Sequence, residues 1–335
     1  MARTVPLLSL AVTALLAGGL LTGCSDDGEP ATGGTATAGA IRVGVLFPGS
    51  LSDDGFMESA YLGYQRAEQA QAGKATFSKV EQVATADFEA ALVRFAGQSD
   101  VVIALGGQTD AAVRLVAPRF PKVRFVEIGG PADGKPLTNL ALYDPQQAQA
   151  AFLSGAASAL LTTTNKVGFV GGAELPAIVN AAKEYANGAA LAKPGVQVLA
   201  PQYVGDFNDV AKAKQSALAD YSAGAGVLGQ ILNLGKKGLA QGATQAKAKL
   251  IGGPIPHDCA TDTAYAGFVK TDVGAGVEYA VEQVVAGTWK AENVKFGLTA
   301  AEPQNDILLC DAPAGVQEKL DAIKADIASG KISTL

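Results

Sequence analysis

Two adjacent carboxylates, Asp53 and Asp54, are the residues most suited to chemistry in the first part of this 335-residue chain. They could act together as a general acid and base, but no neighbouring side chain suggests a reaction. Two other roles need only one ionised carboxylate: capping the helix that is expected to follow, or hydrogen bonding to a polar ligand. The local sequence therefore favours capping or ligand binding over catalysis.

Signatures of enzymes are scarce elsewhere in the chain. His257 is the only histidine, and the sequence contains neither a GxSxG nor an HExxH motif. No metal site and no cofactor are therefore expected. The glycines of residues 104–107 and 168–172 match neither GxGxxG nor the P-loop pattern, so we interpret them as places where the backbone turns sharply or approaches a ligand closely. An exported enzyme remains only a distant alternative.

The N-terminal segment predicts export and lipidation. Arg3 precedes an apolar run over residues 5–21, and small residues stand directly before Cys24. This is the pattern of a lipoprotein signal peptide over residues 1–23, with a membrane anchor helix as the alternative. Residues 24–39 are too poor in large apolar side chains to fold and are expected to form a disordered tether. The protein should be held by a lipid anchor on the extracytoplasmic face of the cell membrane.

Charge and cysteine content narrow the partners further. The formal net charge is −6 at pH 7, which argues against binding to nucleic acid and against a basic face on the membrane. With Cys24 used for lipid, Cys259 and Cys310 remain. In an oxidising compartment they are expected to form a disulfide, and two separately buried thiols are the alternative.

The residues that could carry chemistry must be positioned by the segments around them. From residue 41 onwards, strand-like and helix-like segments alternate with short turns, which is typical of an α/β fold with parallel sheets covered by helices. The alternation starts afresh after residue 144, which predicts a second lobe of similar design. Loops at the carboxyl ends of the strands of both lobes would then border a cleft that suits a small ligand.

Several stretches, in their order and spacing, resemble one family. They are DDGFMESAYLGY, DVVIALGGQTDAAVRLVAPRFPKVRFVEIGG, NLALYDPQQAQAAFLSGAASAL, KVGFVGG, YVGDFNDVAKAKQSALADYSAGAGVL and the closing SGKIS. Together with the lipoprotein signal they resemble the basic membrane protein family, the purine-nucleoside-receptor type of solute-binding lipoprotein. The resemblance implies a type I periplasmic-binding fold with two Rossmann-like lobes and a multi-strand hinge. It also implies an ABC permease and ATPase as partners and a nucleoside as the usual ligand. We expect the protein to be a monomer.

With this fold, the N-terminal lobe is expected to comprise residues 40–143 and about 266–290. The C-terminal lobe is expected to comprise residues 144–265 and about 291–312, followed by a C-terminal helix within residues 313–335.

When the family's ligand-binding positions are transferred to this chain, some of them carry different residues. Phe56 matches the phenylalanine that stacks on the base, but Met57 stands where the family has asparagine. The family's second stacking phenylalanine aligns at about Ala181, with Tyr185 one turn further on, so one aromatic wall is expected to be missing.

The sugar side of the family's site also differs. The family's strand ends in an aspartate that binds the ribose, whereas this chain reads IGGP at residues 251–254 and its nearest acid is Asp258. Lys270 matches the lysine that precedes the family's late helix.

We therefore expect a receptor that closes its two lobes on a small polar ligand, a nucleoside or a nucleoside-like molecule. The alternatives are a lipoprotein that senses the ligand for a membrane signalling partner, and a receptor for another solute such as a sugar. The expected ligand-binding residues are Asp53, Asp54, Phe56 and Met57 in the first loop, Gly107 and Gln108 in the second, and Glu174, Gln230, Asn233, His257 and Lys270 at the remaining edges.

Overall fold

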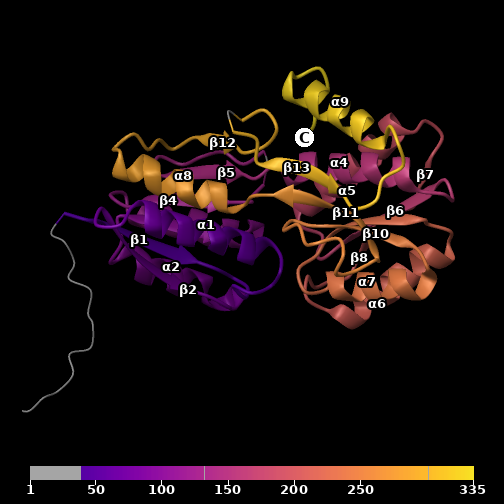
Figure 1. Cartoon of the computed structure of the whole chain (residues 1–335). Coiled ribbons are helices and arrows are strands. Elements are labelled where there is room, and N and C mark those ends of the chain that lie inside the picture. The colour runs from indigo at the N-terminus through magenta and orange to yellow at the C-terminus, as the bar shows by residue number, and fades with distance from the viewer. Residues whose placement is uncertain (1–38, 132, 301) are drawn as a thin grey trace, which may run out of the picture. The chain divides into compact units, whose positions relative to one another are not determined.

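The computed structural model describes residues 39–131, 133–300 and 302–335, and these residues form two α/β lobes (Figure 1). The predicted signal peptide, Cys24 as the expected site of lipidation, and nearly all of the expected tether lie outside the described residues. Within these ranges, every helix is too short or too polar to cross a membrane.

The first lobe is built on a six-stranded parallel sheet with the strand order β12-β5-β4-β3-β1-β2. Its central strands are buried on both faces, which explains why their segments read as continuous apolar runs rather than alternating ones. Its strands are β1 (Ile41–Leu46), β2 (Ala75–Val80), β3 (Val101–Leu105), β4 (Arg124–Ile128), β5 (Leu140–Asp144) and β12 (Asn293–Lys295).

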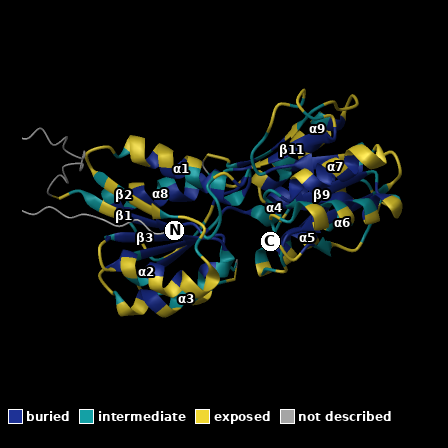
Figure 2. Cartoon of the chain, turned by 90° about the horizontal axis from the view of Figure 1, so that it is seen from below, coloured by how far each residue is buried: buried dark blue, intermediate teal, exposed yellow. Residues whose placement is uncertain are grey.

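Helices cover both faces of this sheet, and their outer sides are exposed (Figure 2). The α-helices are α1 (Phe56–Ala70) and α8 (Gly274–Val285) on one face, and α2 (Phe88–Ala96) and α3 (Asp110–Val116) on the other. Three short 3-10 turns, η1 (Thr85–Asp87), η2 (Gly107–Thr109) and η3 (Ala117–Arg119), complete the lobe. Helices α1 and α8 pack so closely that a Cβ added to Gly274 would lie only 2.6 Å from the Cα of Gly63.

The second lobe has a seven-stranded sheet with the order β13-β11-β10-β9-β6-β7, and β8 also pairs with β6. Its strands are parallel except for β13, which is antiparallel to β11. The strands are β6 (Lys166–Gly171), β7 (Gln197–Val198), β8 (Gln202–Tyr203), β9 (Val227–Ile231), β10 (Lys249–Gly252), β11 (Tyr265–Thr271) and β13 (Asn305–Leu309). The helices are α4 (Gln147–Leu161), α5 (Pro176–Ala192), α6 (Val210–Ser222), α7 (Lys236–Ala246) and α9 (Val316–Ala328).

Small residues allow α4 to lie deep in this lobe. Most of α4 is buried, and it packs directly against α5. A Cβ on Gly155 of α4 would lie 3.0 Å from the Cα of Tyr185, and a Cβ on Gly188 of α5 would lie 3.0 Å from the Cα of Phe152. The alanine- and glycine-rich composition of these two segments therefore serves the close approach of two helix backbones.

Strand pairing moves two of the expected lobe boundaries. The expected second segment of the N-terminal lobe began at about residue 266, but β11 pairs with β10 and β13 in the second sheet. The same segment was expected to end at about residue 290, yet β12 pairs with β5 in the first sheet, with Asn293 opposite Leu142. The chain therefore returns to the first lobe with α8 and β12. Neither β12 nor α7 was expected from the sequence pattern.

Within the described residues, the chain passes between the lobes after β5, after β11 and after β12. Buried amide side chains join these passages. The Gln149 Oε1 atom accepts a 2.7 Å hydrogen bond from the N–H of Leu298, and Asn305 Nδ2 donates to the carbonyl of Gln146 at 3.0 Å. These bonds connect the first and third passages and so define a hinge made of more than one strand.

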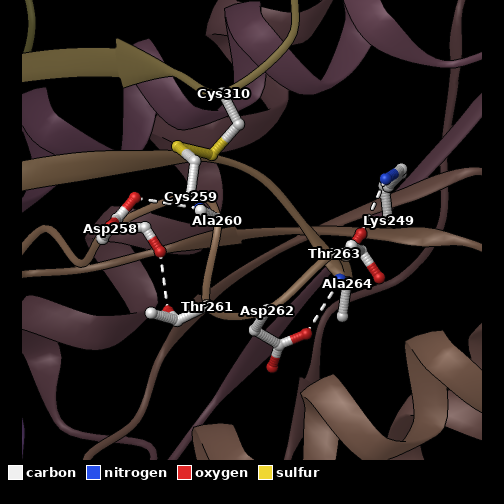
Figure 3. Close-up of a disulfide and its surroundings, with 9 residues drawn as sticks. All are labelled: Lys249, Asp258, Cys259, Ala260, Thr261, Asp262, Thr263, Ala264 and Cys310. Carbon is white, nitrogen blue, oxygen red and sulfur yellow. Dashed lines mark hydrogen bonds between the residues drawn. A yellow bond between two sulfur atoms is a disulfide. The ribbon is translucent and has the colours of Figure 1, made fainter.

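Cys259 and Cys310 form a disulfide with their Cα atoms 5.3 Å apart (Figure 3). It joins the loop after β10 to the residue that follows β13. Next to it, Asp258 makes a local turn: its carboxylate accepts from the N–H of Ala260 at 2.9 Å, and its carbonyl accepts from the hydroxyl of Thr261 at 2.7 Å. The disulfide therefore pins a loop that lies on the lobe boundary to an edge strand of the second sheet.

Candidate ligand-binding cleft

Asp53 and Asp54, in the loop between β1 and α1, have different roles. The side chain of Asp53 is buried and accepts hydrogen bonds from the N–H groups of Gly55, Met57 and Glu58 at 2.9, 3.3 and 3.0 Å. These are the free N–H groups at the start of α1, so Asp53 caps this helix. Burial raises the pKa of Asp53 above its usual value, although the three N–H groups oppose that shift.

Asp54 instead faces the second lobe. One carboxylate oxygen lies 3.1 Å from Lys236 Nζ and the other lies 2.7 Å from His257 Nε2. Lys236 Nζ also donates to the carbonyls of Asp54 and Gly253, the latter at 3.2 Å. The Lys236 side chain is only 2% exposed, and burial lowers its pKa while Asp54 opposes that shift. We call Asp54, Lys236 and His257 the interlobe cluster, because they bind the first lobe to the second.

Two adjoining pockets lie between the lobes and share the lining residues Phe56, Gln147, Ile231 and Asn233. The space inside them, open solvent included, is about 460 and 450 Å³. The first, which we call the Gln230 pocket, is also lined by Ala150, Ala151, Ser154, Gln230, Leu232, Gly252, Gly253, Pro254, Val269 and Thr271. The second, the aromatic pocket, is also lined by Met57, Gly106, Gly107, Gln108, Gly129, Leu175, Ala177, Ile178 and Phe207.

Two phenylalanines from opposite lobes line the aromatic pocket. Phe56 is the first residue of α1, and Phe207 lies in the loop between β8 and α6. Each ring lies against a glycine: a Cβ on Gly129 would be 2.7 Å from Phe56 Cζ, and a Cβ on Gly172 would be 2.6 Å from a ring carbon of Phe207. The glycines at these two strand ends therefore leave space for aromatic rings at the cleft.

The two positions at which the family's second ring was expected do not line the cleft. Ala181 and Tyr185, the positions considered for the second ring, are fully buried, and Tyr185 packs on Phe169 with a centroid distance of 5.4 Å. They lie on the side of α5 that faces the core of the lobe. Phe207 supplies the second ring from a different loop, and an alignment of α5 alone cannot find it.

The polar groups of the cleft are amides and hydroxyls. The Gln230 amide bonds within its own lobe, because Nε2 donates to the carbonyl of Gly253 at 3.2 Å and Oε1 accepts from the N–H of Leu232 at 2.6 Å. Asn233 Oδ1 accepts from the N–H of Phe56 at 3.3 Å, which links the two lobes. The Ser154 hydroxyl is buried and has no hydrogen-bond partner among the described residues.

Six of the residues expected at the ligand line these pockets, namely Phe56, Met57, Gly107, Gln108, Gln230 and Asn233. Five do not line either pocket. Asp53 caps α1, and Asp54 and His257 belong to the interlobe cluster. Glu174 and Lys270 are exposed.

The strand geometry explains why Lys270 is displaced from the cleft. Successive side chains of a strand point to opposite faces. Val269 and Thr271 of β11 line the Gln230 pocket, so Lys270 between them points to the other face. Similarly, Leu175 and not Glu174 lines the aromatic pocket where the chain enters α5.

Other residues of the cleft were not expected from the sequence. Among them are Gln147, Ser154, Phe207 and Thr271, together with Lys236 beside the cleft. Gln147 carried a usable signal, because it begins a helix directly after a strand of a parallel sheet, where ligands commonly bind. The other residues contact the cleft only through the packing of distant segments.

Comparisons with known proteins agree with this geometry. Residues 40–302 match the family described as PnrA-like ABC transporter substrate-binding proteins. A nucleoside-binding protein of an ABC transporter, BmpA of Lactococcus lactis, is 29% identical over 227 residues, which cover 67% of this chain and 64% of that protein. The chain thus spans less than two thirds of the length of this relative. A purine-binding protein of Brucella abortus is 24% identical over 301 residues, which cover 88% of this chain and 82% of that protein.

Solved structures show the same architecture. An ABC transporter solute-binding protein from Aeropyrum pernix superposes with a TM-score of 0.77 at 20% identity, covering 88% of this chain and 93% of that chain. One from Conexibacter woesei superposes with a TM-score of 0.68 at 22% identity, covering 88% and 99%. The fold is therefore that of type I periplasmic-binding proteins, as expected. Since the family match extends over more than half of its residues, the chain belongs to the family of PnrA-like ABC transporter substrate-binding proteins.

Proposed function

We propose that this protein is the solute-binding component of an ABC importer and binds a nucleoside or a nucleoside-like solute between its lobes. The observation that carries the proposal is the pair Phe56 and Phe207, which come from opposite lobes and line one pocket. Aromatic side chains stack readily on planar rings. The nucleoside-binding and purine-binding relatives support the same class of ligand.

Binding without reaction is the chemistry that this cleft supports. Substrate-binding proteins of ABC transporters are not enzymes, and the two carboxylates that could have formed an acid and base are occupied as a helix cap and an interlobe ion pair. A ligand that contacts both lobes favours the closed arrangement by its additional contacts in that state. The passages between the lobes would act as the hinge.

Delivery of the solute requires partners at the membrane. We propose that the lipid on Cys24 holds the protein, as a monomer, at the extracytoplasmic face of the membrane. The closed receptor would then present its solute to an ABC permease, whose ATPase subunits supply the energy for transport.

Isothermal titration calorimetry with purine and pyrimidine nucleosides and their bases tests this function. Phe207→Ala should lower the affinity for the bound solute about 5- to 150-fold, because one stacking contact is worth about 1–3 kcal/mol. Phe120→Ala removes a phenylalanine that lies outside both pockets and should leave the affinity unchanged. The proposal fails if no nucleoside or base binds more tightly than about 1 mM while a sugar or another solute does.

A further inference from the structure

Among the described residues, no charged side chain lines either pocket of the cleft. The two carboxylates of the loop before α1 are already bound by protein groups. Asp53 is held by the N–H groups at the start of α1, and Asp54 is held by Lys236 and His257. A charged solute would therefore lose its water shell in the cleft without gaining an opposite charge, which is strongly unfavourable.

The aromatic pocket offers what a neutral planar heterocycle needs. Phe56 and Phe207 contribute aromatic rings to its lining, and the glycine-rich turn at Gly106 and Gly107 brings backbone groups close to the same space. Gln108 adds a primary amide, which carries both donors and an acceptor. Amide side chains recognise the edges of nucleobases by pairing a donor and an acceptor with the base at once.

The Gln230 pocket is poorly equipped for a sugar. Its wall is formed largely by apolar side chains such as Ala150, Leu232 and Val269. The amide of Gln230 already makes two hydrogen bonds within the protein. Its Nε2 donates to the carbonyl of Gly253, and its Oε1 accepts from the N–H of Leu232. A furanose placed here would find the hydroxyls of Ser154 and Thr271 and the amides of Gln147 and Asn233. It would find no carboxylate, which is the stronger acceptor for sugar hydroxyls.

We infer that this receptor recognises an uncharged planar heterocycle and makes little use of an attached sugar. This inference rests on the function proposed above. A free base should therefore bind at least as tightly as the corresponding nucleoside, and a nucleotide should bind at least 100-fold more weakly than the base. Because the attraction involves no net charge, the affinity for the base should change less than twofold between low and moderate salt.

Calorimetry on the full chain with matched pairs tests this inference: hypoxanthine with inosine, adenine with adenosine, and uracil with uridine, with inosine monophosphate as the charged probe. Binding of a base at least as tightly as its nucleoside supports the inference. A nucleoside that binds more tightly than its base overturns it and leaves the importer proposal intact. If none of these compounds binds while another solute does, the proposed ligand class itself fails.

Variants separate the two pockets. Gln108→Ala should lower the affinity for the base at least tenfold, whereas Gln241→Ala, a change of the same amide outside both pockets, should not alter it. Thr271→Ala removes a hydroxyl of the Gln230 pocket and should change the affinities for base and nucleoside by the same factor. A loss of nucleoside affinity greater than tenfold in Thr271→Ala, with base affinity kept, would show that the sugar is recognised and would refute the inference.

Discussion

The interlobe cluster offers a sharp test of how the lobes are held together. Lys236 is buried and places its ammonium against the carboxylate of Asp54 and the carbonyl of Gly253. Asp54→Asn keeps the size of the side chain but removes the negative charge. The ammonium of Lys236 would then remain buried with neutral hydrogen-bond partners, and only the carboxylates of Asp53 and Glu58 would still act on its charge.

The magnitude follows from the burial of the two partners. Removing one partner of a fully buried pair costs about 3–5 kcal/mol. Asp54 is 21% exposed and Lys236 is 2% exposed, so we expect a loss at the lower end, about 3 kcal/mol, for Asp54→Asn. Lys236→Met removes the buried charge itself and should cost less, about 1 kcal/mol. The double variant should resemble Lys236→Met, which corresponds to a coupling energy of about 3 kcal/mol.

Urea unfolding of the four proteins at pH 7.5 measures the coupling directly. Lys237→Met makes the same chemical change at the exposed neighbour and should shift the stability by less than about 0.5 kcal/mol. Burial lowers the pKa of Lys236 below its usual 10.5, and loss of Asp54 lowers it further. Between the lowered folded value and 10.5 the unfolded chain binds more protons, so stability rises with pH. The loss in free energy of unfolding caused by Asp54→Asn, relative to wild type, should therefore become smaller as the pH approaches 10.5. A coupling energy below about 0.5 kcal/mol would refute this reasoning.

Three further predictions concern the scaffold. Burial, reinforced by Asp110, raises the pKa of Glu127 to about 9. From its usual 4.5 up to 9, the native state holds a proton that the unfolded chain has lost, so wild-type stability falls with pH by up to about 1.4 kcal/mol per unit. Glu127→Gln should flatten this slope in unfolding titrations at pH 5.5–8.5, and an unchanged slope contradicts the assignment. Replacing both cysteines of the 259–310 disulfide by serine should lower stability by about 2–4 kcal/mol in urea, unless the bridge is absent from the purified protein, which thiol titration of the unfolded chain reveals. Gly63→Ala should cost about 1–3 kcal/mol by forcing α1 away from α8, and a thermal melt equal to that of wild type would show that the helices adjust freely.

The sequence was sufficient for the elements whose signal is local. Strands buried on both faces read as apolar runs, and the spacing of Ala60, Gly63, Tyr64 and Ala67 predicts the buried face of α1, which is the face found in the structure. The succession of strand and helix predicted two α/β lobes, and the order of several motifs indicated the family. Weak local signals were missed, as with α7, whose glycines lower helix propensity, and with the three-residue strand β12.

The composition of the cleft was decided by the tertiary structure. Asp53 and Asp54 are adjacent and chemically identical, yet one caps a helix and the other pairs with Lys236, which lies 182 residues away in the chain. Phe207 enters the cleft from a loop that local alignment did not suggest, and Lys270 leaves it because of the alternation of its strand. Local patterns determine backbone conformation over a few residues. Which side chains meet across a cleft depends on how two separately folded sheets are placed by the hinge, and no stretch of the sequence alone encodes that placement.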